Sequence, residues 1–209
     1  MLTFWMGKGS SAIAPHILLE EVRAAYETRI VSLPEGEHRA PDYLSLNPKG
    51  RVPALVTPEG TLTECPALLV WIGQRYPEAG LIPEDPYSFA RGQALASFIC
   101  STVHIHFAHL LRGARWSDDP TVQEAMKAKV PSNLREAAKL IEDHYLDGPW
   151  ALGERYSFVD PYLILVSRWL LLSKAGLDDV PRLKAHTDRL LARPATMRAL
   201  AVHGLEAPV

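Results

Sequence analysis

The chain has 209 residues, 47% of them hydrophobic, which is enough for one large domain or two modest ones with real cores. It carries 22 basic and 24 acidic residues, and this balance gives no reason to expect nucleic acid or an anionic membrane as a partner. The only cysteines are Cys65 and Cys100. They form neither a disulfide framework nor a CxxC motif, and they fit free thiols in a reducing cytoplasm.

Nothing in the sequence favours a membrane-bound protein. The first ten residues, MLTFWMGKGS, contain one lysine and lack the apolar core of a signal peptide. The most apolar stretch, LILVSRWLLL, is too short to cross a bilayer and contains Arg168. We therefore expect a cytoplasmic protein without a membrane span.

The beginning of the chain alternates strand and helix signals. Residues 2–5 are a short apolar run that ends at glycines, which indicates a strand. Residues 15–25 carry apolar side chains near helical spacing, with charged residues between them. Residues 28–33 then indicate a second strand, so the order at this point is strand, helix, strand.

A polar loop at residues 36–43 separates this beginning from a second group of elements. Residues 54–64 predict two strands that are joined at the turn Pro58-Glu59-Gly60. A helix is expected over residues 65–76, because Pro66 suits the first turn of a helix. This group therefore adds strand, strand and helix.

Strand signals disappear after a proline-rich linker at residues 77–86. Four later segments show helical periodicity: residues 86–112, 120–146, 157–174 and 180–200. Ser157 and Asp160 form an S-x-x-D capping box at the start of the third. We predict two unlike domains, an α/β domain over residues 1–78 and an all-α domain over residues 86–209.

The first chemical motif, GKGSSAIAPH, places Ser10 and Ser11 in a glycine-containing turn between a strand and a helix. The free N–H groups of a helix start, together with a hydroxyl, can stabilise an anion there. The motif is no phosphate-binding loop, because Lys8 is followed by Gly9 and not by serine or threonine. A serine that only caps the helix is the ordinary alternative.

Two further motifs follow in the same domain. In NPKGRVPAL, Pro53 precedes a strand-like run, and an ordinary turn is the common structure for such a segment. In TECPALL, Glu64 and Cys65 stand at a predicted helix start, where N–H groups suit a carboxylate ligand. Glu64 could accept a hydrogen bond from a ligand ammonium, or simply complement the helix dipole.

In their order, spacing and residue identities, the three motifs resemble those of cytosolic glutathione transferases, most closely the bacterial beta class. Members of that class typically read like PGACSLAPHI, NPKGQVPAL and TEGVAI in this part of the chain. Later, GERYSFVDPYL resembles the family segment GxxFTIADAYL. The resemblance covers nearly the whole chain. It implies a thioredoxin-like, glutathione-binding domain followed by a helical-bundle domain that carries the hydrophobic substrate site.

The resemblance also implies which residues contact glutathione. Val52 would pair through its backbone with the cysteinyl part, as an added strand does, and its bond to Pro53 would be cis. Glu64 and the N–H of Cys65 would hold the γ-glutamyl end. Lys49 and Arg51 could reach the glycyl carboxylate, and for Lys49 a solvated surface position is the alternative. The implied glutathione site comprises six residues: Lys49, Arg51, Val52, Pro53, Glu64 and Cys65.

The catalytic position departs from the beta class. In an ungapped alignment the catalytic cysteine of that class falls on Ser11, whereas serine-type classes use the position of Ser10. A hydroxyl donor near the sulfur favours the thiolate, which is the reactive nucleophile. Because serine cannot form a mixed disulfide with glutathione, we expect weak thiol-exchange activity.

In the helical domain, the resemblance aligns His104 with a histidine near the active site and Trp169 with a tryptophan of the hydrophobic substrate site. A structural histidine and a core tryptophan are the alternatives. His106 and His109 share one helix face, but no third ligand lies nearby in the sequence. We therefore expect no metal.

The resemblance implies a glutathione transferase that joins the thiolate of glutathione to a small hydrophobic electrophile. A glutathione-dependent isomerase or dehalogenase, and a non-catalytic binding protein, are the alternatives on the same fold. A two-fold homodimer is also expected, because family members are usually dimers. The helix predicted over residues 86–112 supports this, since apolar residues cover much of its circumference.

Overall fold

The structure is a computed structural model, and it describes residues 1–206. These residues divide into two compact units. The first unit contains Met1–Ile82 and the described part of Leu191–Pro208, and the second contains Pro83–Leu190. The C-terminal segment therefore belongs to the first unit, although the predicted boundaries, 1–78 and 86–209, group it with the helical domain.

A mixed four-stranded sheet forms the centre of the first unit. Its strands are β1 (Leu2–Met6), β2 (Tyr26–Ile30), β3 (Ala54–Thr57) and β4 (Gly60–Thr63), in the order β2-β1-β3-β4. The β1–β2 pair is parallel, and the β1–β3 and β3–β4 pairs are antiparallel. Alternate residues of β1, namely Leu2, Phe4 and Met6, are buried, as a strand with one core-facing side requires.

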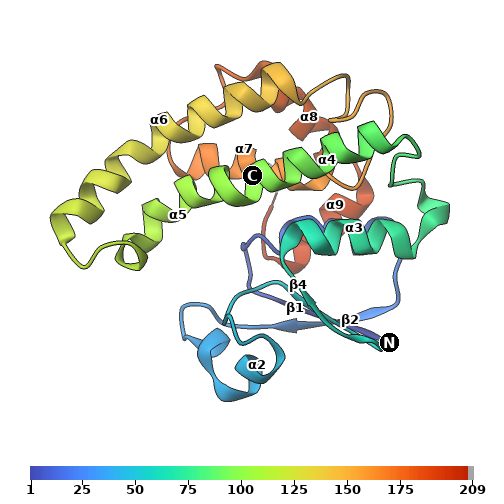
Figure 1. The fold of residues 1–209 in the computed structure, drawn as a ribbon, viewed down its shortest axis with the longest axis horizontal. Helices are drawn as coiled ribbons and strands as arrows, with labels where there is room; N and C mark the ends of the chain where they lie inside the picture. The colour runs from blue at the N-terminus through green and yellow to red at the C-terminus, as the bar shows by residue number, and fades with distance from the viewer. Residues whose placement is uncertain (207–209) are drawn as a thin grey trace. The chain divides into compact units, whose positions relative to one another are not determined.

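Four helices belong to this unit: α1 (Ile13–Glu21), α2 (Pro41–Leu46), α3 (Cys65–Arg75) and α9 (Pro194–Val202). A parallel strand pair needs a crossover connection, and α1 supplies it between β1 and β2. In Figure 1, α3 lies on one side of the sheet and α2 on the other. Helix α1 packs against both α3 and α9, so the C-terminal helix completes the core of the first unit.

The second unit is helical. It contains α4 (Pro86–Phe98), a π-helical turn (Ile99–Val103), α5 (His104–Arg112), α6 (Pro120–His144), α7 (Asp160–Leu172) and α8 (Pro181–Leu191). Helix α7 is buried over nearly its whole length, and α5 and α7 both pack against α6. The expected fold class, a thioredoxin-like α/β part followed by a helical part, is confirmed.

The structure corrects three expected elements. The polar loop at residues 36–43 contains a 3₁₀ turn and the start of α2, a helix too short to show periodicity. Strand β2 begins two residues earlier than expected. The helix expected over residues 180–200 is two helices, because Pro194 has no N–H to continue the first one and instead starts α9.

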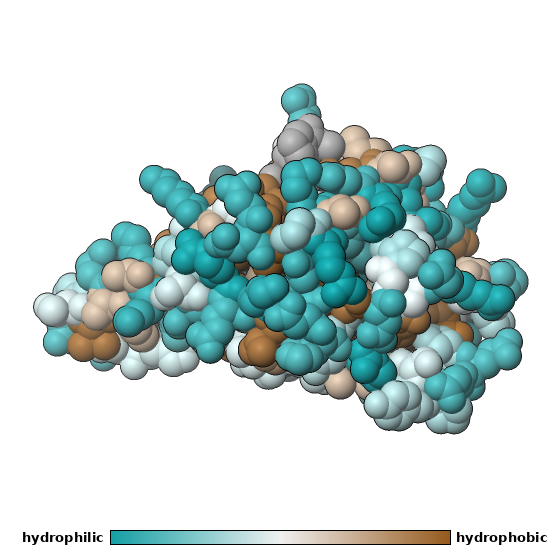
Figure 2. Space-filling view, turned by 90° about the horizontal axis from the view of Figure 1, so that it is seen from above, coloured by the Kyte–Doolittle hydropathy of each residue, from teal (hydrophilic) through white to brown (hydrophobic). Residues whose placement is uncertain are grey.

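By length and composition alone, the stretch Pro86–Arg115 is the one helix among residues 1–206 that could cross a membrane, whereas the sequence analysis expected none. The core helix of a helical unit passes the same test, and Leu95, Ile99 and Val103 of this stretch are buried. In Figure 2 hydrophilic residues cover most of the visible face, and hydrophobic residues appear there only in small areas.

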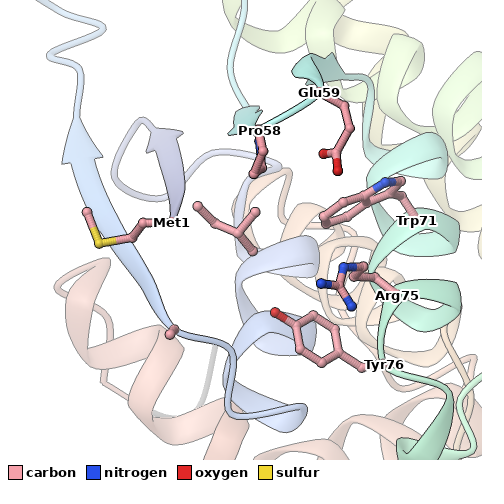
Figure 3. Close-up of a pocket in the computed structure, with 8 residues that line it drawn as sticks. Met1, Pro58, Glu59, Trp71, Arg75 and Tyr76 are labelled. Atoms are coloured by element: carbon pink, nitrogen blue, oxygen red, sulfur yellow. The ribbon is translucent and has the colours of Figure 1, made fainter.

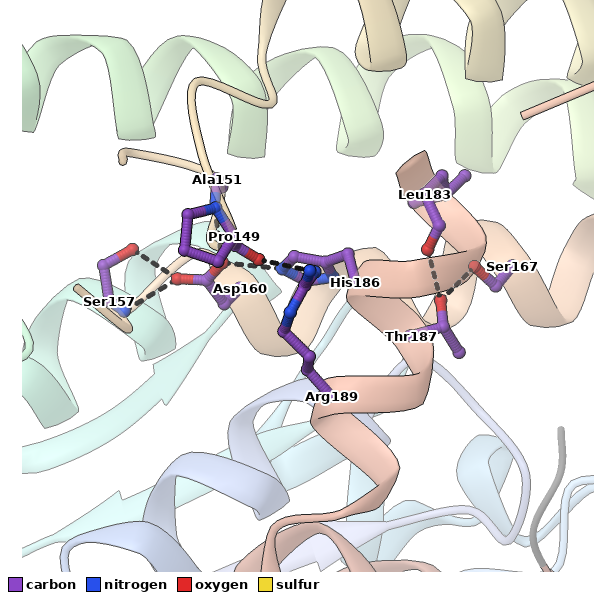
Figure 4. Close-up of polar contacts among 9 residues, drawn as sticks. All are labelled: Pro149, Ala151, Ser157, Asp160, Ser167, Leu183, His186, Thr187 and Arg189. Carbon is purple, nitrogen blue, oxygen red and sulfur yellow. Dashed lines mark hydrogen bonds and ion pairs between the residues drawn. The ribbon is translucent and has the colours of Figure 1, made fainter. Parts of the chain in front are cut away.

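A buried carboxylate organises the start of α7 (Figure 4). One oxygen of Asp160 accepts hydrogen bonds from the N–H of Ala151 and from Nε2 of His186, both at 2.7 Å. The other accepts from the N–H of Ser157 at 2.7 Å and from its hydroxyl at 2.8 Å. The predicted capping box is thus half formed, because the serine hydroxyl donates to Asp160 and does not accept from the helix backbone.

We predict that Asp160→Ala lowers the free energy of unfolding by about 3–5 kcal/mol, because four buried donors lose their acceptor. Asp143→Ala is the control, since this exposed aspartate only pairs with Lys139 one helical turn away. That change should cost no more than about 0.5 kcal/mol. Urea unfolding of both variants measures the difference, and equal losses would contradict the prediction.

Candidate functional site

The loop between β1 and α1 is shaped by its glycines and by Ser10. A side chain at Gly7 would meet Leu33 at 2.8 Å, and Gly9 has a φ of +67°, which favours glycine. The hydroxyl of Ser10 donates to the carbonyl of Gly7 at 2.7 Å and accepts from the N–H of Ala12 at 3.2 Å. Ser10 therefore uses its hydroxyl inside the loop, while the N-cap of α1 is Ala12 and no side chain caps the helix.

Ser11 differs from its neighbour. Its carbonyl accepts a hydrogen bond from the thiol of Cys65 at 3.4 Å, which ties the loop to the start of α3. Among the residues that the structure describes, its hydroxyl has no hydrogen-bond partner, and the side chain is half-buried. Of the two candidate serines, Ser11 is the one whose hydroxyl is available to a ligand.

The turn before β3 is held by one carbonyl group. The carbonyl of Arg51 accepts from the hydroxyl of Tyr43 and from the side-chain amide of Asn47, both at 2.6 Å. Burial raises the pKa of Tyr43 to about 12, so this phenol keeps its proton as a donor. The Val52–Pro53 bond is cis, as the resemblance implies. Within the described chain, the N–H and C=O of Val52 have no backbone partner.

The start of α3 carries the third motif. Glu64 occupies the N-cap position with a φ of +73°, and its side chain makes no capping bond. Its carboxylate instead contacts the ammonium of Lys49, which also donates to the hydroxyl of Thr63 at 2.7 Å. Lys49 is thus paired and not simply solvated. Arg51 is exposed, and Cys65 is buried.

The three motifs meet at one end of the first unit. Cys65 contacts the Ser11 carbonyl, and Lys49 contacts Glu64. Pairing of Trp5 with Ala54 places the last residues of β1 beside the first residues of β3, directly after Pro53. A free hydroxyl, an unpaired backbone segment and a helix N-terminus with a carboxylate therefore surround one region.

His104 and Trp169 lie together in the second unit. Their rings stack with centroids 4.7 Å apart, and Phe107 stacks on the same indole at 5.3 Å. Trp169 is only 3% exposed, so core packing accounts for much of its surface, while His104 is half-exposed. Their roles toward a substrate stay predictions.

The other histidines of α5 do not form a metal site. Burial lowers the pKa of His106, with a smaller contribution from His109, while Glu136 acts in the opposite direction. The ring of His109 packs edge-on against Trp116 at 4.4 Å. In the part of the chain that the structure describes, no group of three or more histidine, cysteine or acidic side chains could hold a metal ion.

A pocket lies at the other end of the sheet (Figure 3). It is lined by Met1, Leu2, Ala25, Pro58, Glu59, Trp71, Arg75 and Tyr76. These residues come from the start of β1, the residue before β2, the turn between β3 and β4, and the C-terminal end of α3. The three motifs instead lie at the end of β1 and the start of α3, so this pocket is separate from them.

Two histidines lie behind the serine loop, and the sequence motifs did not indicate either of them as part of the site. The N–H of Gly9 donates to Nδ1 of His203 at 3.1 Å, and Nε2 of His203 lies 3.2 Å from Nδ1 of His16. Both rings are buried. Because 194 residues separate Gly9 from His203, no local pattern could reveal this contact; the APH sequence after the loop was the only signal, and it concerned His16 alone.

We predict that acid destabilises the first unit through His16. Burial lowers the pKa of His16 from 6.5 to about 4, and the nearby Glu20 opposes this shift only in part. Between these two values the unfolded chain binds more protons than the folded chain, so the free energy of unfolding falls as the pH falls. The loss amounts to about 3 kcal/mol once the pH is below the folded value, and this group contributes nothing above the unfolded value.

Denaturant unfolding of the wild type and of His16→Gln at a series of pH values measures this effect. The variant should show a flatter dependence through this window, because it has no group to protonate at this position. Identical slopes for the two proteins would contradict the prediction.

The sequence matches known families over both units. Residues 1–74 match the family model of the glutathione S-transferase N-terminal domain, and residues 99–194 match that of the C-terminal domain. Glutathione S-transferase GstA of Escherichia coli O157:H7 is 29% identical over 201 residues, or 95% of this chain and 96% of the relative. A maleylacetoacetate isomerase of Pseudomonas aeruginosa is 33% identical over 167 residues, or 78% of this chain and 77% of the relative.

Solved structures give the same result. A glutathione transferase homologue from Sulfitobacter, crystallised with bound glutathione, has a TM-score of 0.94 and 35% identity, with 99% of both chains covered. A beta-class glutathione S-transferase from Sphingomonas chungbukensis has a TM-score of 0.84 and 28% identity, covering 98% of this chain and 100% of the other.

Proposed function

The chain belongs to the glutathione S-transferase family, and from this premise we propose that it joins the thiolate of glutathione to a small hydrophobic electrophile in the cytoplasm. The observation that carries the proposal is the meeting of three motifs at one end of the first unit. Glutathione needs an acceptor for its ammonium, donors for its carboxylates and an edge for its peptide backbone. Glu64, the start of α3 and Val52 offer these groups.

In this proposal the tripeptide lies along Val52 as an added strand, paired to its N–H and C=O. The γ-glutamyl carboxylate accepts from the first N–H groups of α3, including that of Cys65, and its ammonium contacts Glu64. Lys49 already contacts Glu64. It therefore leaves or shares that carboxylate when the ligand ammonium arrives, and with Arg51 it is free to meet the glycyl carboxylate.

Ser11 is the proposed activating group. Its hydroxyl has no competing partner in the described chain, whereas the hydroxyl of Ser10 has two contacts in the loop. A hydroxyl that donates to sulfur stabilises the thiolate over the thiol and lowers the thiol pKa. The positive end of α1 acts in the same direction. The sulfur is then the nucleophile, and the bond to the electrophile forms at carbon.

The second unit would supply the electrophile site. His104 and Trp169 are the residues proposed to face the second substrate, with Phe107 supporting the indole. The expected homodimer is also a proposal. Sedimentation velocity at micromolar concentration tests it, and a single species at the chain mass of 23.2 kDa would exclude it.

A glutathione-dependent isomerase is the second candidate. Similarity to the maleylacetoacetate isomerase of Pseudomonas aeruginosa, at 33% identity, favours it. A transferase consumes one glutathione for each product, whereas a glutathione-dependent isomerase returns the tripeptide unchanged. Measuring free thiol during turnover of electrophiles and of cis-alkene diacids therefore distinguishes the two activities.

We predict that glutathione binds and stabilises the folded chain by mass action, adding about 2.7 kcal/mol when its concentration is one hundred times the dissociation constant. Glu64→Gln should weaken binding about 10- to 100-fold, because a charged contact to the ammonium is lost. Glu59→Gln is the matched control, since Glu59 lines the separate pocket. Calorimetry that detects no heat at millimolar glutathione would refute the proposed function.

We predict that Ser11→Ala raises the pKa of the bound thiol and slows turnover by about 10²–10³, the usual effect of losing one donor to a developing anion. Ser10→Ala should instead lower stability by about 1 kcal/mol, because it removes a helix-start contact. Ultraviolet absorbance of the thiolate against pH, together with turnover, measures both variants. The reverse pattern would assign the activating role to Ser10.

A further inference from the structure

A continuous series of hydrogen bonds, fully buried only between its two histidines, runs from the serine loop to the surface of the first unit. It starts at the N–H of Gly9, which contacts Nδ1 of His203 at 3.1 Å. It continues from Nε2 of His203 to Nδ1 of His16 at 3.2 Å, and from Nε2 of His16 to the hydroxyl of Tyr26 at 2.8 Å. The hydroxyl of Tyr26 donates to Glu20 at 2.5 Å.

The contact between Gly9 and His203 determines which group donates and which accepts in every hydrogen bond of the series. A backbone N–H can only donate, so Nδ1 of His203 is an acceptor without a proton. The proton of a neutral His203 is then on Nε2, from which it donates to Nδ1 of His16. His16 is in turn protonated on Nε2 and donates to Tyr26. Each ring therefore has a single tautomer that satisfies both of its contacts.

Both rings are shielded from solvent, and burial lowers the pKa of His16 to about 4. His16 is 0% exposed and His203 is 3% exposed. The ring of His16 also contacts the rings of Phe4, at 5.3 Å, and of Tyr26. A charged His203 would carry a proton on Nδ1 and point it at the N–H of Gly9, and a charged His16 would do the same to His203. Protonation would therefore disrupt the series at the loop.

The surface end of the series is anchored by α9. Arg198 donates from Nε to the carboxylate of Glu20 at 2.6 Å and from Nη2 to its carbonyl at 3.0 Å. Arg193 donates from Nε and Nη2 to the two carboxylate oxygens of Glu21. Burial raises the pKa of the Tyr26 phenol, the Glu20 carboxylate raises it further, and Arg198 acts in the opposite direction. The phenol therefore remains a donor at every working pH.

We propose that His203 is a positioning residue for thiol activation: it holds the Gly9 amide from behind and so fixes where the following Ser11 hydroxyl and the start of α1 face the bound sulfur. This inference rests on the proposed function. Gly9 is two residues before Ser11, and its left-handed backbone makes the loop sensitive to loss of this contact. The C-terminal helix thus contributes to the reaction without touching glutathione.

Three variants separate positioning from folding. His203→Leu removes the acceptor for Gly9 and the donor to His16. His203→Gln is the conservative variant, because its amide can accept from Gly9 with oxygen and donate to His16 with nitrogen. Tyr26→Phe is the matched control, since it interrupts the same series at the far end and leaves the Gly9–His203 contact in place.

We expect His203→Leu to lower kcat about 10- to 100-fold and to raise the pKa of the bound thiol, with little change in KM for glutathione. His203→Gln should restore most of both values, and Tyr26→Phe should keep them near the wild type even if it is less stable. Loss of stability in His203→Leu with kcat and thiol pKa unchanged would reduce the residue to a structural role and overturn the proposal.

The protonation of the two histidines can also be measured on the wild-type protein, so this test does not depend on whether a variant folds. Long-range proton–nitrogen NMR spectra of the ¹⁵N-labelled chain at neutral pH should show His203 and His16 both neutral and protonated on Nε2. A proton on Nδ1 of His203 would overturn the inference. Calorimetry on the same sample reports glutathione binding separately, so failure of the proposed function is distinguished from failure of the positioning role.

Discussion

The structure of the first unit depends on one helix that has no polar face along most of its length. Seven consecutive residues of α1, from Ile13 to Leu19, are buried. Such a helix must be covered on every side: α3 and α9 pack against it, and the ring of Phe4 from the sheet contacts the ring of His16. The same packing brings the serine loop, the start of α3 and the C-terminal helix to one place, so the candidate site follows from the burial of α1.

Much of the first unit could be predicted from local signals. The apolar run of β1, the turn between β3 and β4 and the start of α3 each rest on a few adjacent residues. Helix α2 was not predicted, because its six residues are too few to show periodicity. Helix α9 was not predicted as a separate helix, because its start at Pro194 interrupts a longer helical pattern only slightly. The attachment of α9 to the first unit depends on contacts between distant segments, which no window of sequence contains.

The candidate site shows the same division between local and distant information. The motifs place Ser10 and Ser11 in one loop. A motif records only residue types, so it does not distinguish two adjacent serines. Hydrogen bonds distinguish them, because Ser10 already serves the carbonyl of Gly7 and the N–H of Ala12. The contact of Lys49 with Glu64 likewise joins two motifs through residues that are fifteen positions apart in the sequence.

The proposed activation of the thiol by a serine hydroxyl places a particular demand on this loop. A cysteine can act by its own covalent chemistry, whereas a serine stabilises a thiolate only through a hydrogen bond, whose strength depends steeply on distance and angle. Precise placement must then come from the residues that hold the loop. The histidine pair behind Gly9 supplies directional contacts of this kind, and burial lowers the pKa of His16 to about 4, so this ring is neutral at neutral pH. In this proposal, the activating serine and the buried histidines are two parts of one physical arrangement.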